Sequence, residues 1–189
     1  MKFCSECAQP ISKLVPAGDN RQRYVCVSCD TIHYQNPRIV AGTLPTYKGQ
    51  VLLCKRAIEP RKGYWTLPAG FMENGETTEE GALRETLEEA NARIQNPHLY
   101  TMIAVPHISQ VHIFFQGELA DLDFFCGPES LEVRLFDEAD IPWQELAFPT
   151  TSTTLRRFYS DRQQTIDNKQ NPSLPTHVFD IPEKDKLKL

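Results

Sequence analysis

The chain has 189 residues, 40% hydrophobic and 24% charged, and its 20 basic and 25 acidic residues give a net charge of −5. This composition is typical of a globular protein with one full domain, a small module and a core that buries about 70% of the unfolded surface. The negative charge argues against broad nucleic-acid binding, and no apolar run approaches the ~18 residues that a membrane span needs. Because no apolar signal core follows Met1, we expect a cytoplasmic protein.

Two Cys-x2-Cys pairs mark the start of the chain, Cys4 with Cys7 and Cys26 with Cys29. Each pair can form a tight turn with both thiolates on one side, and together the pairs supply a tetrahedral zinc site. A segment this short cannot build its own core, so a metal that cross-links it is physically reasonable. We therefore predict a zinc ribbon over residues 1–36 with a structural Zn²⁺. Two disulfides or a redox pair are the alternatives, but nothing marks the chain as secreted and a redox motif needs no duplication.

The remaining candidates for zinc chemistry are weaker. His33 lies near the cysteine pairs in the sequence, but four thiolates already complete the zinc shell and leave no open position for catalysis. Cys54 and Cys126 are expected to pack as small apolar residues.

Beyond residue 36 the pattern changes to short apolar strands separated by turns. Residues 38–44 and 51–54 read as strands, and the turn at 47–50 joins them into a hairpin. Residues 58–70 carry proline and glycine breaks and are predicted to form a loop. Further strands are predicted at 98–105, 111–119 and 131–136.

Two helices are predicted. The first runs from the capping-box pair Thr77 and Glu80 to about Ala92, with an apolar stripe of Ala82, Leu83, Leu87 and Ala90. The second spans 150–161, with Leu155, Phe158 and Tyr159 as its apolar side. Residues 163–189 are polar and proline-containing, which predicts an irregular C-terminal tail in which 176–179 docks on the domain. This order of strands and helices favours an α+β fold.

Carboxylates crowd the first helix and the loop before it. On a helix, Glu89 lies about 40° from Glu85 and Glu88 about 60° to the other side, so the three share one face. Like charges at this spacing repel, and a hard divalent cation such as Mg²⁺ offsets the repulsion. The alternative is a solvated acidic face, but such faces usually interleave lysine. Here Arg84 is the single base of the helix, and it can reach back to Glu76.

These residues spell G-x5-E-x7-R-E-x2-E-E without a gap, at Gly70, Glu76, Arg84, Glu85, Glu88 and Glu89. The pattern resembles the Nudix box, the signature of Nudix hydrolases. The family usually has bulky apolar residues where Thr86 and Ala92 stand and glycine where Asn91 stands. Asn tolerates the left-handed conformation, so it can still end the helix. The resemblance implies a Nudix α/β/α sandwich with a mixed sheet over residues 37–162.

The resemblance also implies a chemistry. Nudix hydrolases cleave the pyrophosphate of a nucleoside diphosphate derivative with Mg²⁺ or Mn²⁺. By that analogy the catalytic group comprises Arg84, Glu85, Glu88, Glu89 and a late acid, and the metal ligands are Glu85, Glu89, the late acid and a backbone carbonyl at Ala69 or Gly70. For the late acid we favour Glu129 over Glu132, with two solvated loop acids as the alternative. Glu76 and Arg84 are then structural braces.

A cysteine ribbon before a Nudix domain is similar to the NADH pyrophosphatase-like subgroup, over residues 1–160. That subgroup carries S-Q-P-W-P-F-P-x-S after the box, and the stretch from Ile103 to Gln110 does not match it. Related ribbon-bearing Nudix enzymes act on ADP-ribose and FAD, and the sequence resembles those more closely. The resemblance therefore implies ADP-ribose or FAD as substrate, with release of AMP. An NADH or NAD-capped-RNA pyrophosphatase is the alternative, and so is a non-catalytic nucleotide sensor, against which the intact carboxylates argue.

Contacts to the rest of such a dinucleotide are less visible. Four aromatic residues could stack on an adenine or flavin ring: Tyr64, Trp65, Phe71 and Phe148. Three basic residues could hold phosphates: Arg56, Arg61 and Lys62. Three polar residues stand where the subgroup's motif would be: His107, Ser109 and Gln110. From these we select Phe71, Arg56 and Gln110 as substrate-binding residues. Nudix domains often pair, so we expect that the chain can form a homodimer.

Overall fold

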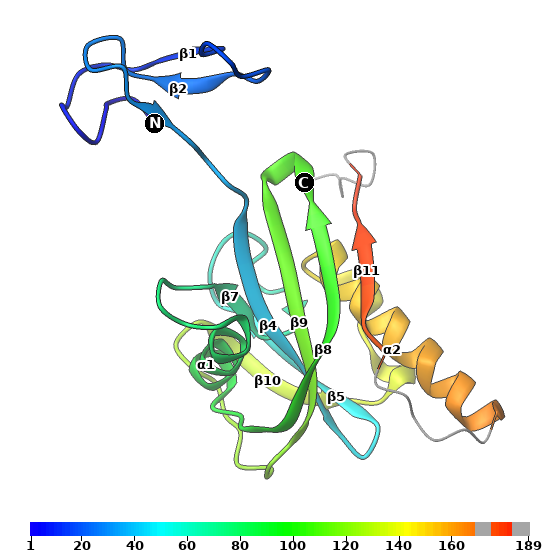
Figure 1. Ribbon diagram of the computed structural model, residues 1–189. Helices are drawn as coiled ribbons and strands as arrows, with labels where there is room; N and C mark the ends of the chain where they lie inside the picture. The colour runs from blue at the N-terminus through cyan, green and yellow to red at the C-terminus, as the bar shows by residue number, and fades with distance from the viewer. Residues whose placement is uncertain (169–174, 183–189) are drawn as a thin grey trace. The chain divides into compact units, whose positions relative to one another are not determined.

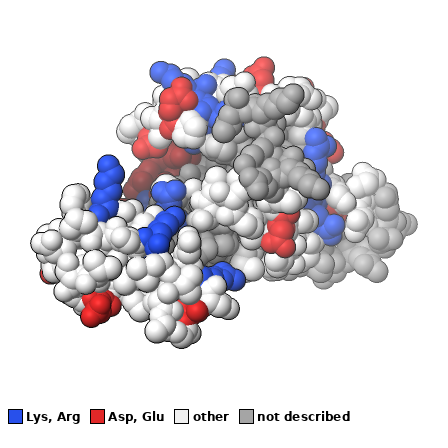
Figure 2. All heavy atoms as spheres, turned by 90° about the horizontal axis from the view of Figure 1, so that it is seen from above, with Lys and Arg blue, Asp and Glu red and all other residues white. Residues whose placement is uncertain are grey.

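The computed structural model describes residues 1–168 and 175–182 and divides the chain into two compact units, Met1–Pro37 and Arg38–Leu189. In Figure 1 the first unit consists of short strands and loops, and the second of a long twisted sheet with helices. On the face shown in Figure 2, the Lys and Arg side chains are interspersed with Asp and Glu side chains. Neither helix of the described residues combines the length and the hydropathy that a membrane span requires.

The first unit is a three-stranded antiparallel sheet of β1 (Ser12–Leu14), β2 (Arg23–Val25) and β3 (Ile32–His33), in that order. Strands this short bury little apolar surface. Two of its few buried side chains are Cys4 and Cys26, which are 4% and 0% exposed. Sulfur therefore occupies the position that a hydrophobic core would fill in a larger domain.

The second unit contains eight strands, at Arg38–Tyr47 (β4), Gln50–Arg56 (β5), Trp65–Thr66 (β6), Ala69–Phe71 (β7), Ile94–Val105 (β8), Gln110–Leu119 (β9), Ser130–Phe136 (β10) and His177–Asp180 (β11). They form one mixed sheet in the order β10-β5-β4-β9-β8-β11, in which β4–β9 and β8–β11 are parallel pairs. The short strands β6 and β7 pair with β5 and β4.

Two α-helices cover the sheet, at Thr78–Ala90 (α1) and Pro149–Asn168 (α2), and 3-10 turns lie at Pro106–Ile108, Glu138–Asp140 and Trp143–Glu145. Successive residues of a strand point to opposite faces. Accordingly Leu53 of β5 packs in the cluster that holds Leu155 of α2, whereas its neighbour Leu52 packs with Ala90 of α1. Both faces of the sheet are thus buried, which confirms the expected α/β/α sandwich.

Several sequence predictions are confirmed locally. The hairpin between β4 and β5 forms with Tyr47 opposite Gln50, and its turn residues Lys48 and Gly49 both have positive φ, as tight hairpin turns require. Cys54 is 1% exposed in the core. Cys126, in contrast, is exposed, so the prediction that it packs as an apolar residue is wrong.

The predicted loop over 58–70 is wrong in part, because β6 and the start of β7 lie within it. Each of these strands is two or three residues long and pairs with a distant segment, so no local periodicity announces it. The pairing of Ala69 with Gly42 depends on close backbone approach, since a Cβ at Gly42 would collide with Ala69.

The irregular tail predicted over 163–189 is wrong for residues 163–168 and 177–180, which are helix and strand, whereas the predicted docking of 176–179 on the domain is confirmed by the pairing of β11 with β8. Helix α2 continues to Asn168, seven residues beyond the predicted end. The apolar stripe stops near Tyr159, but no proline follows until residue 172, and Arg162 ties the helix to the hairpin by donating from Nη1 to the Gly49 carbonyl at 2.7 Å. Residues 177–180 form β11, and 169–174 and 183–189 lie outside the described residues.

Candidate active site

Helix α1 presents the acidic side chains, and its two ends are fixed by the local sequence. Thr77 caps the first turn by accepting from the Glu80 amide at 3.2 Å, and the Glu80 carboxylate accepts from the Thr77 amide at 2.7 Å. Asn91 ends the helix in the left-handed conformation with φ 49°. Both features agree with the sequence, and together they set which residues face the strands.

The loop before α1 is braced against the helix by Arg84. Its guanidinium donates to Glu76 at 2.8 Å and 3.0 Å, to Glu85 at 2.8 Å and to Glu88 at 3.2 Å. It also donates to the Phe71 carbonyl at 3.2 Å. The hydrogen bond from Arg84 lowers the pKa of Glu76 to about 2. Arg84 therefore fixes the loop and partly neutralises its acidic neighbours.

Glu85 lies directly against the backbone of β7. A Cβ added at Gly70 would collide with its carboxylate, so the glycine is needed for this approach. Burial is the main cause that raises the pKa of Glu85, and the charges of Glu88 and Glu129 act in the same direction.

Glu89 is the most buried carboxylate of the group, 7% exposed. Its Oε2 accepts one hydrogen bond, from the Ala69 amide at 3.3 Å. Burial raises the pKa of this carboxyl to about 8, and the negative charges of Glu85 and Glu129 contribute. A buried acid with one amide partner has unused acceptor capacity, which suits a hard cation.

Glu129 reaches the same region because its loop packs on the end of α1. The amides of Phe125 and Gly127 donate to the Ala90 and Glu89 carbonyls, both at 2.9 Å, and so satisfy carbonyls that a helix C-terminus leaves unpaired. A Cβ at Gly127 would collide with the backbone of Glu88. The Glu129 carbonyl then accepts from the Ala57 amide at 2.8 Å, which places Glu129 beside β5.

Thr86 shows how this chain accommodates a departure from the Nudix box. It is fully buried, and its Oγ1 donates to the Ala82 carbonyl at 2.7 Å and lies 2.6 Å from the Thr43 hydroxyl on β4. Because the Thr86 proton goes to Ala82, the Thr43 hydroxyl donates to Thr86 Oγ1 where the family has an apolar contact. Helix and sheet are therefore joined by hydrogen bonds at this point.

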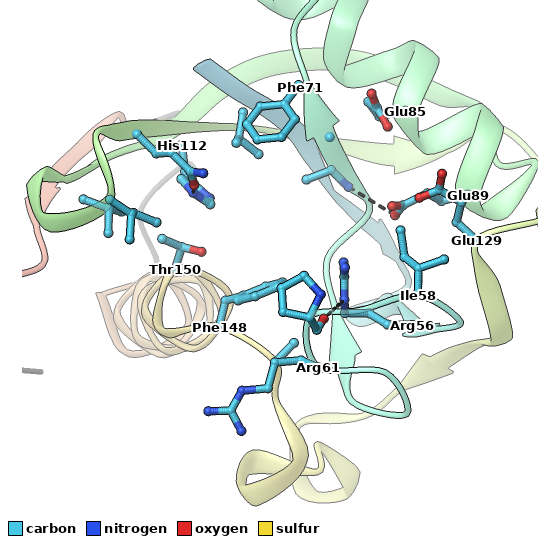
Figure 3. A pocket seen from close by; sticks show the side chains of 18 of the residues that line it. Arg56, Ile58, Arg61, Phe71, Glu85, Glu89, His112, Glu129, Phe148 and Thr150 are labelled. Atoms are coloured by element: carbon cyan, nitrogen blue, oxygen red, sulfur yellow. Dashed lines mark hydrogen bonds between the residues drawn. The ribbon is translucent and has the colours of Figure 1, made fainter. Parts of the chain in front are cut away.

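These carboxylates line one end of a pocket of about 1150 Å³. Figure 3 shows Glu85, Glu89 and Glu129 on one side, His112 and Thr150 on the other, with Phe71 and Phe148 between them. Arg56 also lines the pocket, with its guanidinium carbon 5.1 Å from the centre of the Phe148 ring. The pocket therefore has an acidic end, an arginine beside it and a largely uncharged far end.

Most candidates named from the sequence line this pocket: Ala69, Gly70, Phe71, Arg84, Glu85, Glu88, Glu89, Glu129, Arg56, Arg61, His107, Gln110 and Phe148. Trp65 is instead 5% exposed in the core, where its ring packs edge-on against Phe136. Tyr64, Lys62, Ser109 and Glu132 are not among the pocket residues. The placement brings the candidate carboxylates together at one pocket.

Sequence reasoning missed His112, Thr150 and Ile181, which also line the pocket. Burial lowers the pKa of His112 to about 4, so its ring is uncharged at neutral pH, and its Nε2 lies 2.9 Å from Gln110 Oε1. Thr150 is 3% exposed, and Figure 3 shows its hydroxyl turned into the pocket. Alternation along 110–119 would have placed His112 on the same face as Gln110.

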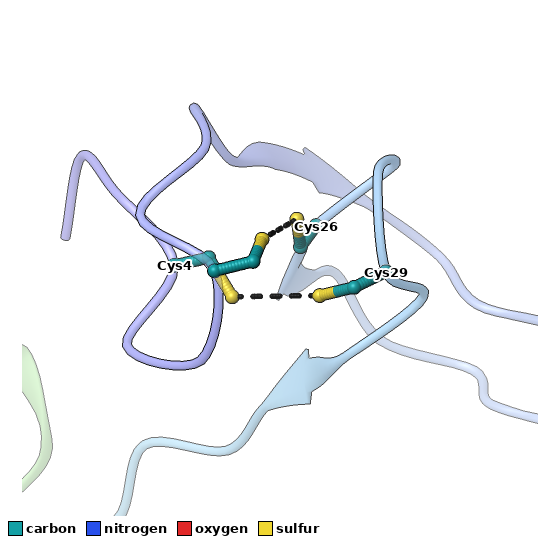
Figure 4. A group of neighbouring side chains, drawn as sticks. Cys4, Cys26 and Cys29 are labelled. Atoms are coloured by element: carbon teal, nitrogen blue, oxygen red, sulfur yellow. Dashed lines mark hydrogen bonds between the residues drawn. The ribbon is translucent and has the colours of Figure 1, made fainter.

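The cysteines form a separate site in the first unit. Their four sulfur atoms lie within 4.8 Å of one another, with Cys4–Cys29 at 3.7 Å and Cys7–Cys26 at 3.4 Å (Figure 4). Four thiolates on one Zn²⁺ would lie about 3.8 Å apart, given Zn–S bonds of about 2.3 Å, so the residues present fit this metal. His33 Nε2 lies 3.4 Å from Cys4 Sγ, so it contacts one sulfur of the cysteine cluster.

The two candidate metal sites differ in how tightly they are gathered. Within the part of the chain that the structure describes, only the four cysteines bring three or more ligand atoms within 4.8 Å of one another. The carboxylates stand further apart, and Arg84 lies between Glu85 and Glu88.

Comparison with known proteins assigns both units to described families. Residues 2–35 match the family described as Nudix N-terminal, and residues 36–159 match the NUDIX domain. The chain belongs to the Nudix hydrolase family. The residues matched to the NUDIX domain thus carry the acidic helix and most of the pocket, and the cysteine site belongs to the N-terminal module.

Individual relatives agree with this assignment. A crystal structure of a NUDIX hydrolase from Nitrosomonas europaea is 51% identical, covers 96% of this chain and 99% of its own, and superposes with a TM-score of 0.88. NAD-capped RNA hydrolase NudC of Salmonella typhi is 26% identical to this chain. The aligned region covers 85% of this chain and 59% of that protein. The NUDIX domain of Shewanella oneidensis NrtR, solved with ADP ribose, is 19% identical, covers 70% of this chain and 89% of its own, and shares the fold with a TM-score of 0.55.

Proposed function

We propose that this Nudix hydrolase cleaves the pyrophosphate bond of a nucleoside diphosphate derivative in the presence of Mg²⁺ or Mn²⁺, with ADP-ribose or FAD as the favoured substrates and AMP as a product. The observation that carries the proposal is the convergence of Glu85, Glu89 and Glu129 at one end of a pocket large enough for a dinucleotide. A structural Zn²⁺ in the cysteine site is part of the same proposal.

The donor set fits a hard cation because it consists of carboxylate oxygens, one of them buried. We assign Glu85, Glu89 and Glu129 as ligands, with Glu88 beside them and a backbone carbonyl at Ala69 or Gly70. When bound, the cation supplies positive charge against the diphosphate and lowers the pKa of a water molecule. Without that charge the acidic end would repel the substrate.

The chain's own residues then orient the rest of the substrate. Arg56 lies against Phe148 on the pocket wall, and its Nε donates to the Pro60 carbonyl at 2.8 Å. These contacts fix the guanidinium in a position from which its remaining N–H groups can donate to a phosphate oxygen. Phe71 is 47% exposed and offers a ring face for stacking. Gln110, His112 and Thr150 can hydrogen-bond to an uncharged base or ribose at the far end.

A second candidate is hydrolysis of NADH or NAD-capped RNA. It is supported by the similarity to NAD-capped RNA hydrolase NudC of Salmonella typhi, which is 26% identical over 85% of this chain. The stretch from Ile103 to Gln110 lacks the subgroup's motif. We therefore rank NADH below ADP-ribose and FAD as a substrate.

The test is a substrate panel on the full chain with Mg²⁺ and, separately, Mn²⁺. ADP-ribose, FAD, NADH and a short NAD-capped RNA are incubated at equal concentration, and AMP or the nicotinamide mononucleotide product is quantified by chromatography. We expect the highest kcat/KM on ADP-ribose or FAD and loss of turnover in Glu85→Gln. Preference for NADH or capped RNA would favour the second candidate. Tight binding with no cleavage of any compound would favour a nucleotide sensor.

A further inference from the structure

Strand β11 ends at the pocket. His177, Phe179 and Ile181 alternate with the exposed Val178, so these three side chains face inward. The amide of Ile181 donates to the Ala104 carbonyl at 2.9 Å, which continues the parallel pairing with β8 past the end of the strand. Ile181 is 6% exposed and lines the pocket.

Ile181 belongs to the far end of the pocket, away from the carboxylates. It packs with Val105, and Val105 lies opposite Gln110 on β9. An independent argument comes from α2. His177 contacts Asp161 at 2.7 Å, and from there Thr150 lies eleven residues back along the helix, about 16 Å. Figure 1 shows β11 running in the direction opposite to α2. Ile181 lies four residues forward along the strand, about 13 Å, so Thr150 and Ile181, which both line the pocket, lie toward the same end of it.

A polar cluster fixes the strand that carries Ile181. Asp161 of α2 accepts from the Tyr100 hydroxyl at 2.8 Å and from Arg157 at 2.8 Å, in addition to its contact with His177. The His177 ring also packs edge-on against Tyr100, with ring centres 5.3 Å apart. The position of Ile181 is therefore defined by the sheet and by α2 together.

We propose that Ile181 is a specificity-determining residue of the active site, which forms an apolar wall against an uncharged ring in the half of the substrate that lies away from the carboxylates. The inference rests on the proposed function and deepens it. The wall is apolar because Val105 and Ile181 pack together, and the polar groups beside it, Gln110 and Thr150, carry no charge. A planar base can pack on such a wall, whereas an additional phosphate would be desolvated there without a cation.

The test compares Ile181→Ala, Ile181→Val and Ile181→Trp with Val178→Ala and Val178→Trp in the full chain. Val178 is the matched control because it is 65% exposed on the opposite face of the same strand. With ADP-ribose and FAD as probes, we expect Ile181→Ala to raise KM about tenfold with kcat within about twofold, as for apolar groups lost from a binding pocket. Ile181→Val should retain most of the affinity, Ile181→Trp should obstruct binding, and both Val178 variants should match the wild type.

Unchanged KM values in the Ile181 variants would overturn the inference while leaving the proposed function intact. Equal changes in the Val178 variants would also overturn it, because they would indicate a general effect of the strand. Calorimetric binding of ADP-ribose in Ca²⁺ separates the remaining cases. If the wild type binds but cleaves neither probe, and Ile181→Ala weakens binding, the proposed hydrolysis fails, and only the contact of Ile181 with the bound nucleotide stands. If the wild type neither binds nor cleaves, both are rejected.

Discussion

The Arg84 guanidinium donates to both oxygens of the Glu76 carboxylate, from Nη2 at 2.8 Å and from Nε at 3.0 Å. Glu76 Oε1 also accepts from the Glu73 amide at 2.6 Å. One carboxylate thus joins the loop after β7 to the middle of α1, on which Glu85 and Glu89 lie. The ion pair between Arg84 and Glu76 positions the acidic residues of α1. Its own polar atoms are already paired with each other.

Glu76→Gln is therefore expected to lower activity and stability together. The paired carboxyl has a pKa of about 2 against an ordinary value of 4.5, so its contribution to stability is present above about pH 4.5 and lost as pH falls toward 2. Melting temperatures of wild type and variant should differ at pH 7 and converge in acid. Glu79→Gln, in the exposed first turn, is the control. A variant with wild-type activity and an unchanged pH profile would refute the brace.

Glu89→Gln should abolish most activity, with kcat lowered at least about 100-fold, because a ligand is removed. Its effect on the metal-free protein is opposite in sign. The folded protein holds a proton on Glu89 up to about pH 8, whereas the unfolded chain releases it near 4.5, so wild-type stability falls as pH rises through this window.

The glutamine variant should therefore melt higher than the wild type at pH 8 and similarly at pH 4.5, in buffer depleted of Mg²⁺ and Mn²⁺. Glu88→Gln, whose side chain is 58% exposed, should show a smaller effect. Parallel melting curves at both pH values would contradict the burial argument, and a fully active Glu89→Gln would contradict the ligand assignment.

The hydroxyl pair of Thr43 and Thr86 allows a double-mutant test. Thr86→Val leaves the buried Thr43 hydroxyl without its partner and should cost about 1–2 kcal/mol of unfolding free energy. Thr43→Val should cost less, because Thr86 still donates to Ala82. The double variant should recover part of the loss, since both polar groups are then gone. Strictly additive effects in urea unfolding would mean that the two hydroxyls do not interact.

The features that could be predicted from the sequence are those set by local spacing. The capping box at Thr77, the end of α1 at Asn91 and the reach of Arg84 to Glu76 all follow from residues within one or two turns. The hairpin at Tyr47 and Gln50 is of the same kind. Each of these depends on neighbours whose separation is fixed by the backbone itself.

The features that could not be predicted depend on distant pairings. Thr43 meets Thr86 across the helix–sheet interface, β6 and β7 exist only through their partners, and β11 adds to β8 from the far end of the chain. Ile181 enters the pocket for the same reason. As an aromatic residue, Trp65 is a candidate for stacking on a base, but its ring fills the core instead. Only the packing of the folded chain decides between these two positions.

Removal of zinc should unfold the first unit before the Nudix domain, because sulfur ligands replace a hydrophobic core there. Calorimetry after chelation should show a new low-temperature transition, and Cys29→Ser should lose the metal measured by elemental analysis. Cys126→Ser, at an exposed cysteine outside the cluster, should retain it. An unchanged melting profile after verified metal removal would argue against a structural ion.

The central claim is that the acidic end of the pocket holds divalent cations, and anomalous diffraction from Mn²⁺-soaked crystals tests it most directly. The account predicts a peak bounded by Glu85, Glu89 and Glu129, which disappears in Glu89→Gln. Ordered crystals that take up Mn²⁺ elsewhere and show no anomalous density between these carboxylates would contradict it.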